Sequence, residues 1–202
     1  MLLQTHKLSK IYRQRTEAGF WRNLLVPSYH DVQALHNVNM KVEAGECIGI
    51  LGRNGAGKST LVKLICGLQQ PTSGSLQVLG KSVQGLRHEL FHDVAVIFGH
   101  KSSLWWDLPL QDSLRAARRI YNIPATDFGK RLQYLIDALN LGSVLNRPVR
   151  VLSLGERVKA EIAFNLLHRP RLILLDEPTI GLDLLAKQTL RTVIKELITT
   201  EE

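Results

Sequence analysis

The chain has 202 residues, 45% of them hydrophobic and 22% charged, which is typical of one folded domain with or without a small lobe and excludes a disordered chain. No apolar run approaches the roughly 20 residues of a membrane-spanning helix, and residues 1–7 become polar too early for a signal peptide, so we expect a cytoplasmic protein. The formal net charge of +8 favours an anionic partner without choosing among nucleotide, lipid headgroups and nucleic acid.

Apolar segments of strand length alternate along the chain with segments of helical periodicity, which predicts an α/β protein. Between about 101 and 150 the pattern changes to helix formers, and we interpret this stretch as a helical lobe inserted into the core. We therefore expect a single domain over residues 1–202, with its core in 1–100 and 151–202. The segments of strand character are 76–79, 94–98 and 172–175, and those of helical character are 61–68 and 132–139.

A glycine-rich loop at residues 52–59 matches GxxxxGK[ST], with a strand-like segment before it, 47–51, and an apolar-faced helix after it. Glycines allow backbone N–H groups to turn around phosphate oxygens, Lys58 reaches the terminal phosphates, and Ser59 ligates magnesium. A purely structural turn is the alternative, but the strand–loop–helix context favours nucleotide. The expected ATP-binding residues are Gly52, Arg53, Asn54, Gly55, Ala56, Gly57, Lys58, Ser59 and Thr60.

The segment 152–157, LSLGER, reads locally as the start of a helix. Ser153 at the N-cap and Glu156 three residues later fit a capping box, in which each side chain satisfies a backbone donor. That explanation needs no function, so the order of this segment relative to the other motifs carries the functional information.

An apolar strand at residues 172–175 ends in Asp176 and Glu177. A buried strand tolerates two acids only where their charge meets a cation or a site. This is the placement of a Walker B motif, in which Asp176 belongs to the magnesium shell and Glu177 polarises the water that attacks the γ-phosphate. A helix-capping pair of acids is the alternative, although Pro178 and Gly181 fit a loop.

The order of phosphate loop, LSLGE and LLDEPTIGLD resembles that of ABC transporter ATP-binding domains over nearly the whole chain. The resemblance implies a P-loop NTPase core of the RecA type with an N-terminal antiparallel β region and an inserted α-helical lobe. It also implies a Mg²⁺-dependent ATPase in which two copies sandwich ATP between the phosphate loop of one chain and the signature of the other. The matching signature positions are Leu152, Ser153, Leu154, Gly155 and Glu156, the last of which replaces the family's usual glutamine and brings a negative charge near phosphate.

The resemblance extends to single positions outside the main motifs. Tyr12 matches the aromatic residue that stacks on adenine, with a strand-end tyrosine as the alternative. Asp183 lies in the loop through which two subunits communicate, and it also fits an N-cap. His100 stands where the family places a glutamine that senses magnesium and water, so it is a second candidate catalytic residue beside Glu177, with an exposed loop histidine as the alternative. No histidine follows His168, so we expect a chain truncated before the family's switch histidine, with strong ATP binding and weak hydrolysis.

The expected partners are a second copy of the chain and an integral membrane permease. The stretch 103–109, with two tryptophans, follows His100 in the region that meets the membrane subunit in ABC exporters, so we expect an exporter with a separate permease and a peripheral position on the inner face of the cell membrane. Packing of the tryptophans inside the lobe is the alternative. The basic and aromatic stretch 13–32 fits either a surface insertion or a contact with permease or lipid.

Parts of the sequence also fit two other functions. A non-transport ABC-type ATPase acting on nucleic acid or ribosomes would suit the positive charge. However, about 118 positions between Lys58 and Asp176 leave no room for a long coiled-coil insertion, so no nucleic-acid partner is expected. Residues 88–92 fit the HExxH pattern of zinc proteases, but no third ligand is evident in the sequence.

Overall fold

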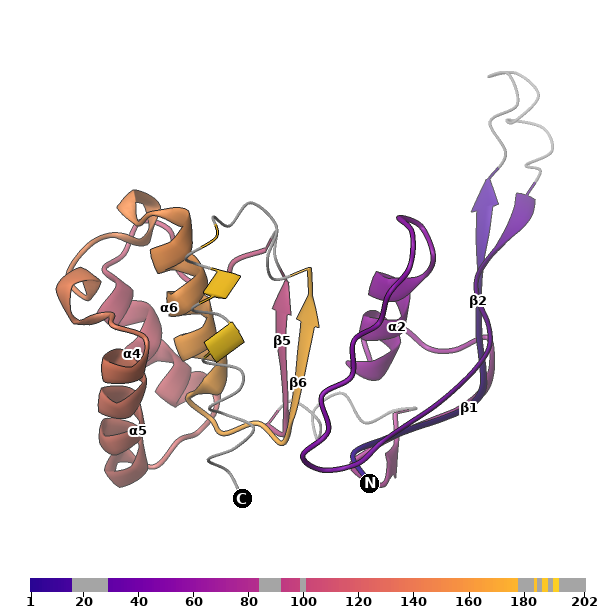
Figure 1. Cartoon of the computed structure of the whole chain (residues 1–202), viewed down its shortest axis with the longest axis horizontal. Coiled ribbons are helices and arrows are strands. Elements are labelled where there is room, and N and C mark those ends of the chain that lie inside the picture. The colour runs from indigo at the N-terminus through magenta and orange to yellow at the C-terminus, as the bar shows by residue number, and fades with distance from the viewer. Residues whose placement is uncertain are drawn as a thin grey trace. The chain divides into compact units, whose positions relative to one another are not determined.

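The computed structural model describes residues 1–15, 29–83, 92–98 and 101–177, together with positions 184, 187, 188, 191 and 192. The chain divides into two compact units, residues 1–90 and 91–202 (Figure 1). Each unit is described by itself.

The first unit is built on an antiparallel sheet with the strand order β2-β1-β3-β4. The long strand β1 pairs with β2 from Leu3 opposite Val42 to Arg15 opposite Tyr29, and its other edge pairs with β3. Leu8, Leu76 and Val78 are almost fully buried, as are the apolar side chains of helix α2, which contacts β2. The antiparallel β region expected at the N-terminus is thus confirmed. The elements are β1 (Leu3–Arg15), β2 (Tyr29–Val42), α2 (Lys58–Ile65), β3 (Ser73–Val78) and β4 (Lys81–Ser82).

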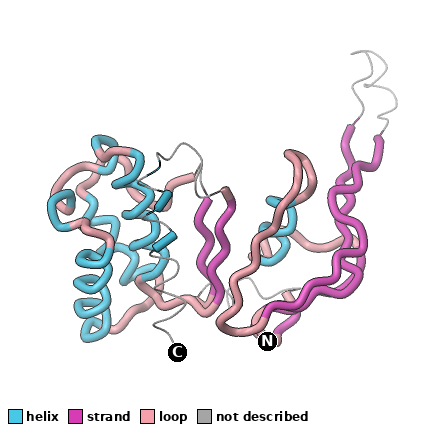
Figure 2. The backbone as a smooth tube through the Cα atoms, viewed as in Figure 1, coloured by secondary structure: helices cyan, strands magenta, loops and turns pink. Residues whose placement is uncertain are grey.

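The second unit combines a parallel pair of strands with a group of helices, which Figure 2 shows packed together beside the strands. Strands β5 and β6 run parallel in register from Val94 opposite Leu172 to Phe98 opposite Asp176. A single apolar cluster joins the helices to β5, and its most buried members are leucines such as Leu110, Leu114 and Leu141. The elements are β5 (Val94–Phe98), α4 (Leu110–Ile120), α5 (Ala125–Ala138), the 3₁₀ turns η1 (Gly142–Val144) and η2 (Val149–Val151), α6 (Leu154–Leu166) and β6 (Leu172–Asp176).

These elements agree with the expected α/β fold class, and α4 and α5 fall within the helical stretch expected at about 101–150. The prediction of a strand at residues 47–51 was wrong, because this segment has no regular secondary structure. A strand needs a hydrogen-bonded neighbour, and the described strands of this unit pair with one another rather than with this segment. Its apolar side chains are consequently exposed, Leu51 to 96%. Among the residues that the structure describes, no helix has the length and apolar character needed to span a membrane.

Candidate nucleotide-binding site

The phosphate loop of the first unit leads directly into α2. The Lys58 ammonium donates to the carbonyl oxygens of Gly52 at 2.9 Å and Arg53 at 3.0 Å, while the N–H of Ala56 donates to the Arg53 carbonyl at 3.1 Å. The lysine charge is therefore held at the loop, beside the N-terminal end of α2, where free N–H groups and the helix dipole favour an anion.

Gly57 is the glycine of this loop at which a side chain would clash with the neighbouring strand β2. Its φ is +89°, and a Cβ at this position would lie 2.2 Å from the carbonyl oxygen of Ala34 and 2.8 Å from Leu35 Cδ2, both on β2. The N–H of Leu61 donates to the Gly57 carbonyl at 2.9 Å, so the first bond of the helix forms here. The second glycine of the pattern therefore lets β2 and the start of α2 approach closely. The sequence pattern alone explains this glycine only by phosphate binding.

Tyr12 on β1 is tied to the same helix. Its hydroxyl donates to Gln69 Oε1 and lies 3.4 Å from Thr60 Oγ1, and the Lys10 ammonium is 5.2 Å from the ring centroid. The structure thus brings Tyr12 to Thr60, one residue beyond the magnesium ligand expected at Ser59. Stacking of adenine on this ring stays a prediction.

The acidic pair of the second unit lies at the carboxyl end of the parallel strands. Asp176 is the last residue of β6, opposite Phe98, and is only 5% exposed, whereas Glu177 is exposed. Glu177 has a φ of +54°, a left-handed conformation that costs energy in a residue with a Cβ and occurs preferentially at functional sites. The carboxyl ends of parallel strands are where α/β sheets bind ligands, so the placement of both acids fits their expected roles.

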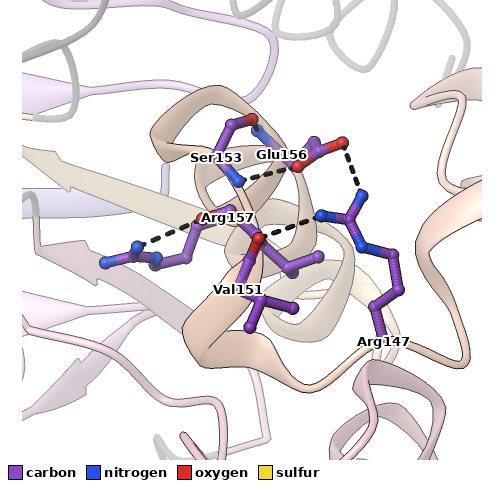
Figure 3. A network of polar contacts seen from close by, with 6 residues as sticks. Arg147, Val151, Ser153, Glu156 and Arg157 are labelled. Carbon is purple, nitrogen blue, oxygen red and sulfur yellow. Dashed lines mark hydrogen bonds and ion pairs between the residues drawn. The ribbon is translucent and has the colours of Figure 1, made fainter.

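The signature segment forms the capping box that its sequence indicates. Ser153 Oγ accepts from the Glu156 N–H at 3.2 Å, and Glu156 Oε2 accepts from the Ser153 N–H at 2.7 Å. Figure 3 shows Arg147 beside this turn, with one guanidinium nitrogen 3.4 Å from Glu156 Oε1 and the other donating to the Val151 carbonyl at 2.9 Å. The hydrogen bond from the Ser153 N–H, with the charge of Arg147, lowers the pKa of Glu156. The carboxylate is therefore ionised at neutral pH.

The tryptophan stretch 103–109 is fastened to the signature helix. The Arg157 guanidinium lies 4.6 Å from the Trp106 ring centroid, and the Trp106 carbonyl accepts from the Arg150 N–H at 2.9 Å. Trp105 and Trp106 are each 48% exposed, so they are not packed inside the lobe. Their exposure fits a surface that meets another molecule.

Glu161 is a buried acid that the sequence did not single out. It lies on α6 and is 7% exposed, and its carboxylate accepts from the Ser102 hydroxyl and from the Ser103 N–H at 2.8 Å. Burial raises the pKa of Glu161. These bonds hold the start of the tryptophan stretch on α6, yet the partners lie 58 and 59 positions apart, so no local pattern identifies them.

Several expected features fall outside the described residues. His100, Asp183, most of the stretch 13–32 and the segment 88–91 of the HExxH pattern belong to this group. Arg147 and Arg157, by contrast, lie within the described residues. Sequence reasoning did not identify either arginine as part of the site, and their only signal was a position within six residues of Ser153.

Comparison with known proteins gives a consistent assignment. The family described as ABC transporter matches residues 35–180. The chain is 34% identical over 166 residues to the ABC transporter ATP-binding protein NatA of Bacillus subtilis, covering 82% of this chain and 68% of NatA. It is 31% identical over 170 residues to the Nod factor export ATP-binding protein I of Ralstonia nicotianae, covering 84% of this chain and 53% of that protein.

A solved structure gives the same fold. It is a dimeric ATP-binding cassette in a post-hydrolysis state with ADP and Pi, which superposes with a TM-score of 0.78 at 22% identity, covering 99% of this chain and 84% of that one. Together with the phosphate loop, the acidic pair and the capped signature helix, these matches confirm the P-loop NTPase fold. The chain belongs to the ABC transporter family, as an ATP-binding domain.

Proposed function

We propose that this chain is the Mg²⁺-dependent ATPase subunit that powers export through a separate membrane-embedded permease. The observation that carries the proposal is the phosphate loop, in which Lys58 is held over the loop carbonyls at the N-terminal end of α2 and Gly57 permits the close approach of β2. The loop combines a fixed cation with helix N–H donors, which is the chemistry that binds a triphosphate.

The resemblance to ABC ATP-binding domains assigns magnesium to Ser59 and Asp176. Their hydroxyl and carboxylate oxygens are hard ligands, the type that Mg²⁺ prefers alongside phosphate oxygens and water. When bound, the ion would neutralise charge on the β- and γ-phosphates. Glu177 would orient the attacking water and accept its proton as the new O–P bond forms and the bond from the γ-phosphorus to the departing ADP oxygen breaks, while Lys58 would stabilise the charge on the terminal phosphate.

The complete site in this proposal contains two chains. Ser153 uses an oxygen lone pair to accept from Glu156, so its hydroxyl proton remains available for a phosphate oxygen of ATP held by the second copy. The N–H groups of Leu154 and Gly155 lie in the first turn of α6, where no carbonyl of the same helix can accept them. The resemblance to ABC ATPases supports this arrangement, as does the dimer formed by the solved cassette.

The tryptophan stretch supports a membrane partner. Trp105, Trp106 and Leu108 are between 43% and 48% exposed, and the hydrogen bonds to Glu161 fix the residues before them. An anchored group of apolar side chains suits docking to another protein. We assign this surface to the permease and place the chain at the inner face of the cell membrane. Export follows the expected exporter resemblance and agrees with the name of the Ralstonia relative.

The test is magnesium-dependent ATP hydrolysis at several protein concentrations, together with equilibrium binding of ATP. We expect activity that rises more than linearly with concentration, because two chains form each site. Glu177→Gln should abolish hydrolysis and keep binding, whereas Lys58→Ala should abolish both. Lys63→Ala, which removes the same charge from the last turn of α2, is the control and should change neither. Unchanged ATP binding in Lys58→Ala would contradict the proposal.

A permease partner is tested separately, by sedimentation of the full chain with membranes that contain its permease. A double change of Trp105→Ser and Trp106→Ser should release the chain from the membranes and leave ATP binding unchanged. Retention of the double variant on the membranes would show that this surface is not the docking site.

A further inference from the structure

Glu156 brings a negative charge to the turn that, in the proposed dimer, receives the phosphates of ATP. Of its two carboxylate oxygens, Oε2 accepts from the Ser153 N–H at 2.7 Å and Oε1 lies 3.4 Å from an Arg147 guanidinium nitrogen (Figure 3). Arg147 donates through its other terminal nitrogen to the Val151 carbonyl at 2.9 Å. One arginine thus bridges the turn before the signature and the acid within it.

Folding stability does not account for this arrangement. The Arg147 and Glu156 side chains are 45% and 33% exposed, and exposed ion pairs change a folding equilibrium by roughly fivefold or less. The capping role of Glu156 is also independent of charge, because a glutamine oxygen accepts the same Ser153 N–H. The ion pair therefore introduces a negative charge and neutralises it, while contributing little to folding stability.

The charge does matter when a triphosphate approaches. Water and salt screen an exposed carboxylate, but a site closed between two proteins excludes both, so repulsion between Glu156 and phosphate grows as the dimer closes. A guanidinium held on the carboxylate cancels that repulsion at its source.

We propose that Arg147 is a positioning residue that neutralises Glu156 and so allows a signature turn with a glutamate to receive ATP bound to a second copy of this chain. The inference rests on the proposed two-chain site. Arg147 lies outside the signature motif, and its proposed function depends on the negative charge of Glu156.

The experiment measures Mg·ATP-driven dimerisation by sedimentation velocity, with Glu177→Gln as the parent chain so that ATP is not consumed. Arg147→Ala should weaken ATP-driven dimerisation by about tenfold or more, because the uncompensated charge of Glu156 would repel phosphate in each of the two sites of the dimer. Arg115→Ala is the matched control, because it removes an exposed arginine paired with Asp112 at 3.6 Å on α4. This control should stay within about twofold of the parent.

The decisive variant combines Arg147→Ala with Glu156→Gln. If Arg147 acts by neutralising the acid, the double variant should dimerise within about threefold of Glu156→Gln alone. A defect that persists in the double variant would instead assign the effect to the bond with the Val151 carbonyl and overturn the inference. Equal dimerisation of Arg147→Ala and the control would overturn it as well.

A charge-conserving variant and the parent chain itself provide the remaining controls. Arg147→Lys keeps the charge and should dimerise like the parent, which preserves the test if Arg147→Ala folds poorly by circular dichroism. A parent that binds ATP and yet stays monomeric would refute the two-chain site itself, and the inference with it, whereas a dimerising parent with an unaffected Arg147→Ala refutes the inference alone.

Discussion

Replacing Gly57 by alanine should damage the start of α2 far more than the same change at Gly55. Both glycines have a positive φ, +89° and +83°, so alanine at either position incurs about 1–2 kcal/mol of backbone strain. At Gly55 a Cβ meets nothing within 4 Å, but at Gly57 it would lie 2.2 Å from the Ala34 carbonyl oxygen. That oxygen must move about 1 Å to restore contact, and overpacking of this kind adds about 1–3 kcal/mol.

We therefore expect Gly57→Ala to lower the free energy of unfolding by about 2–5 kcal/mol, against about 1–2 kcal/mol for Gly55→Ala. Urea titration followed by far-ultraviolet circular dichroism measures both, and the midpoints should separate clearly. Equal losses of stability would refute the reasoning, because they would mean that β2 does not constrain the loop. An ATP-binding measurement on the same variants should show the larger loss for Gly57→Ala.

Two further predictions concern the second unit. Burial lowers the pKa of His168 to about 4, with a smaller contribution from His92 that Asp93 opposes. Because the unfolded chain binds that proton near pH 6.5 and the folded chain only near pH 4, stability should fall as the pH drops through this window. After allowance for solvent screening the loss is about 1–2 kcal/mol, and urea titrations at pH 7.5 and pH 5 should show it in the parent and not in His168→Phe. The contact of Trp106 with Arg157 should contribute about 0.5–1 kcal/mol in a double-mutant cycle, and a coupling energy of zero would show that the ring and the guanidinium are independent.

The sequence predicted those features whose causes are local. Strand β5 occupies the expected residues 94–98, and β6 extends the expected strand by one residue to include Asp176. The cap formed by Ser153 and Glu156 follows from two residue types at a fixed spacing, so it was also recognised correctly. Periodicity and capping each depend on a few neighbouring residues, and these are what a single sequence contains.

The features that sequence reasoning missed depend on distant neighbours. The segment 47–51 has the composition of a strand but pairs with none of the described strands of the first unit, since composition does not supply a hydrogen-bonding neighbour. The pair formed by Glu161 and Ser102 joins residues 59 positions apart. Arg147 reaches Glu156 across nine positions that include a 3₁₀ turn, so helical spacing rules do not connect them.

Helix α6 links the two surfaces on which the proposed function depends. Ser153 caps this helix and Glu156 lies in its first turn, the Arg157 guanidinium lies 4.6 Å from the Trp106 ring centroid, and one turn later Glu161 binds the residues before the tryptophans. A rigid helix transmits a displacement at one of these contacts to the others, because successive turns are joined by backbone hydrogen bonds. Any partner that moves the tryptophan stretch must therefore either move the capped signature turn or break the contacts with Arg157 and Glu161. Since Glu161 is buried and hydrogen-bonded, breaking its contacts leaves a buried acid without its donors, which is the costlier outcome. Movement of the signature turn is accordingly the expected response to a partner at this surface.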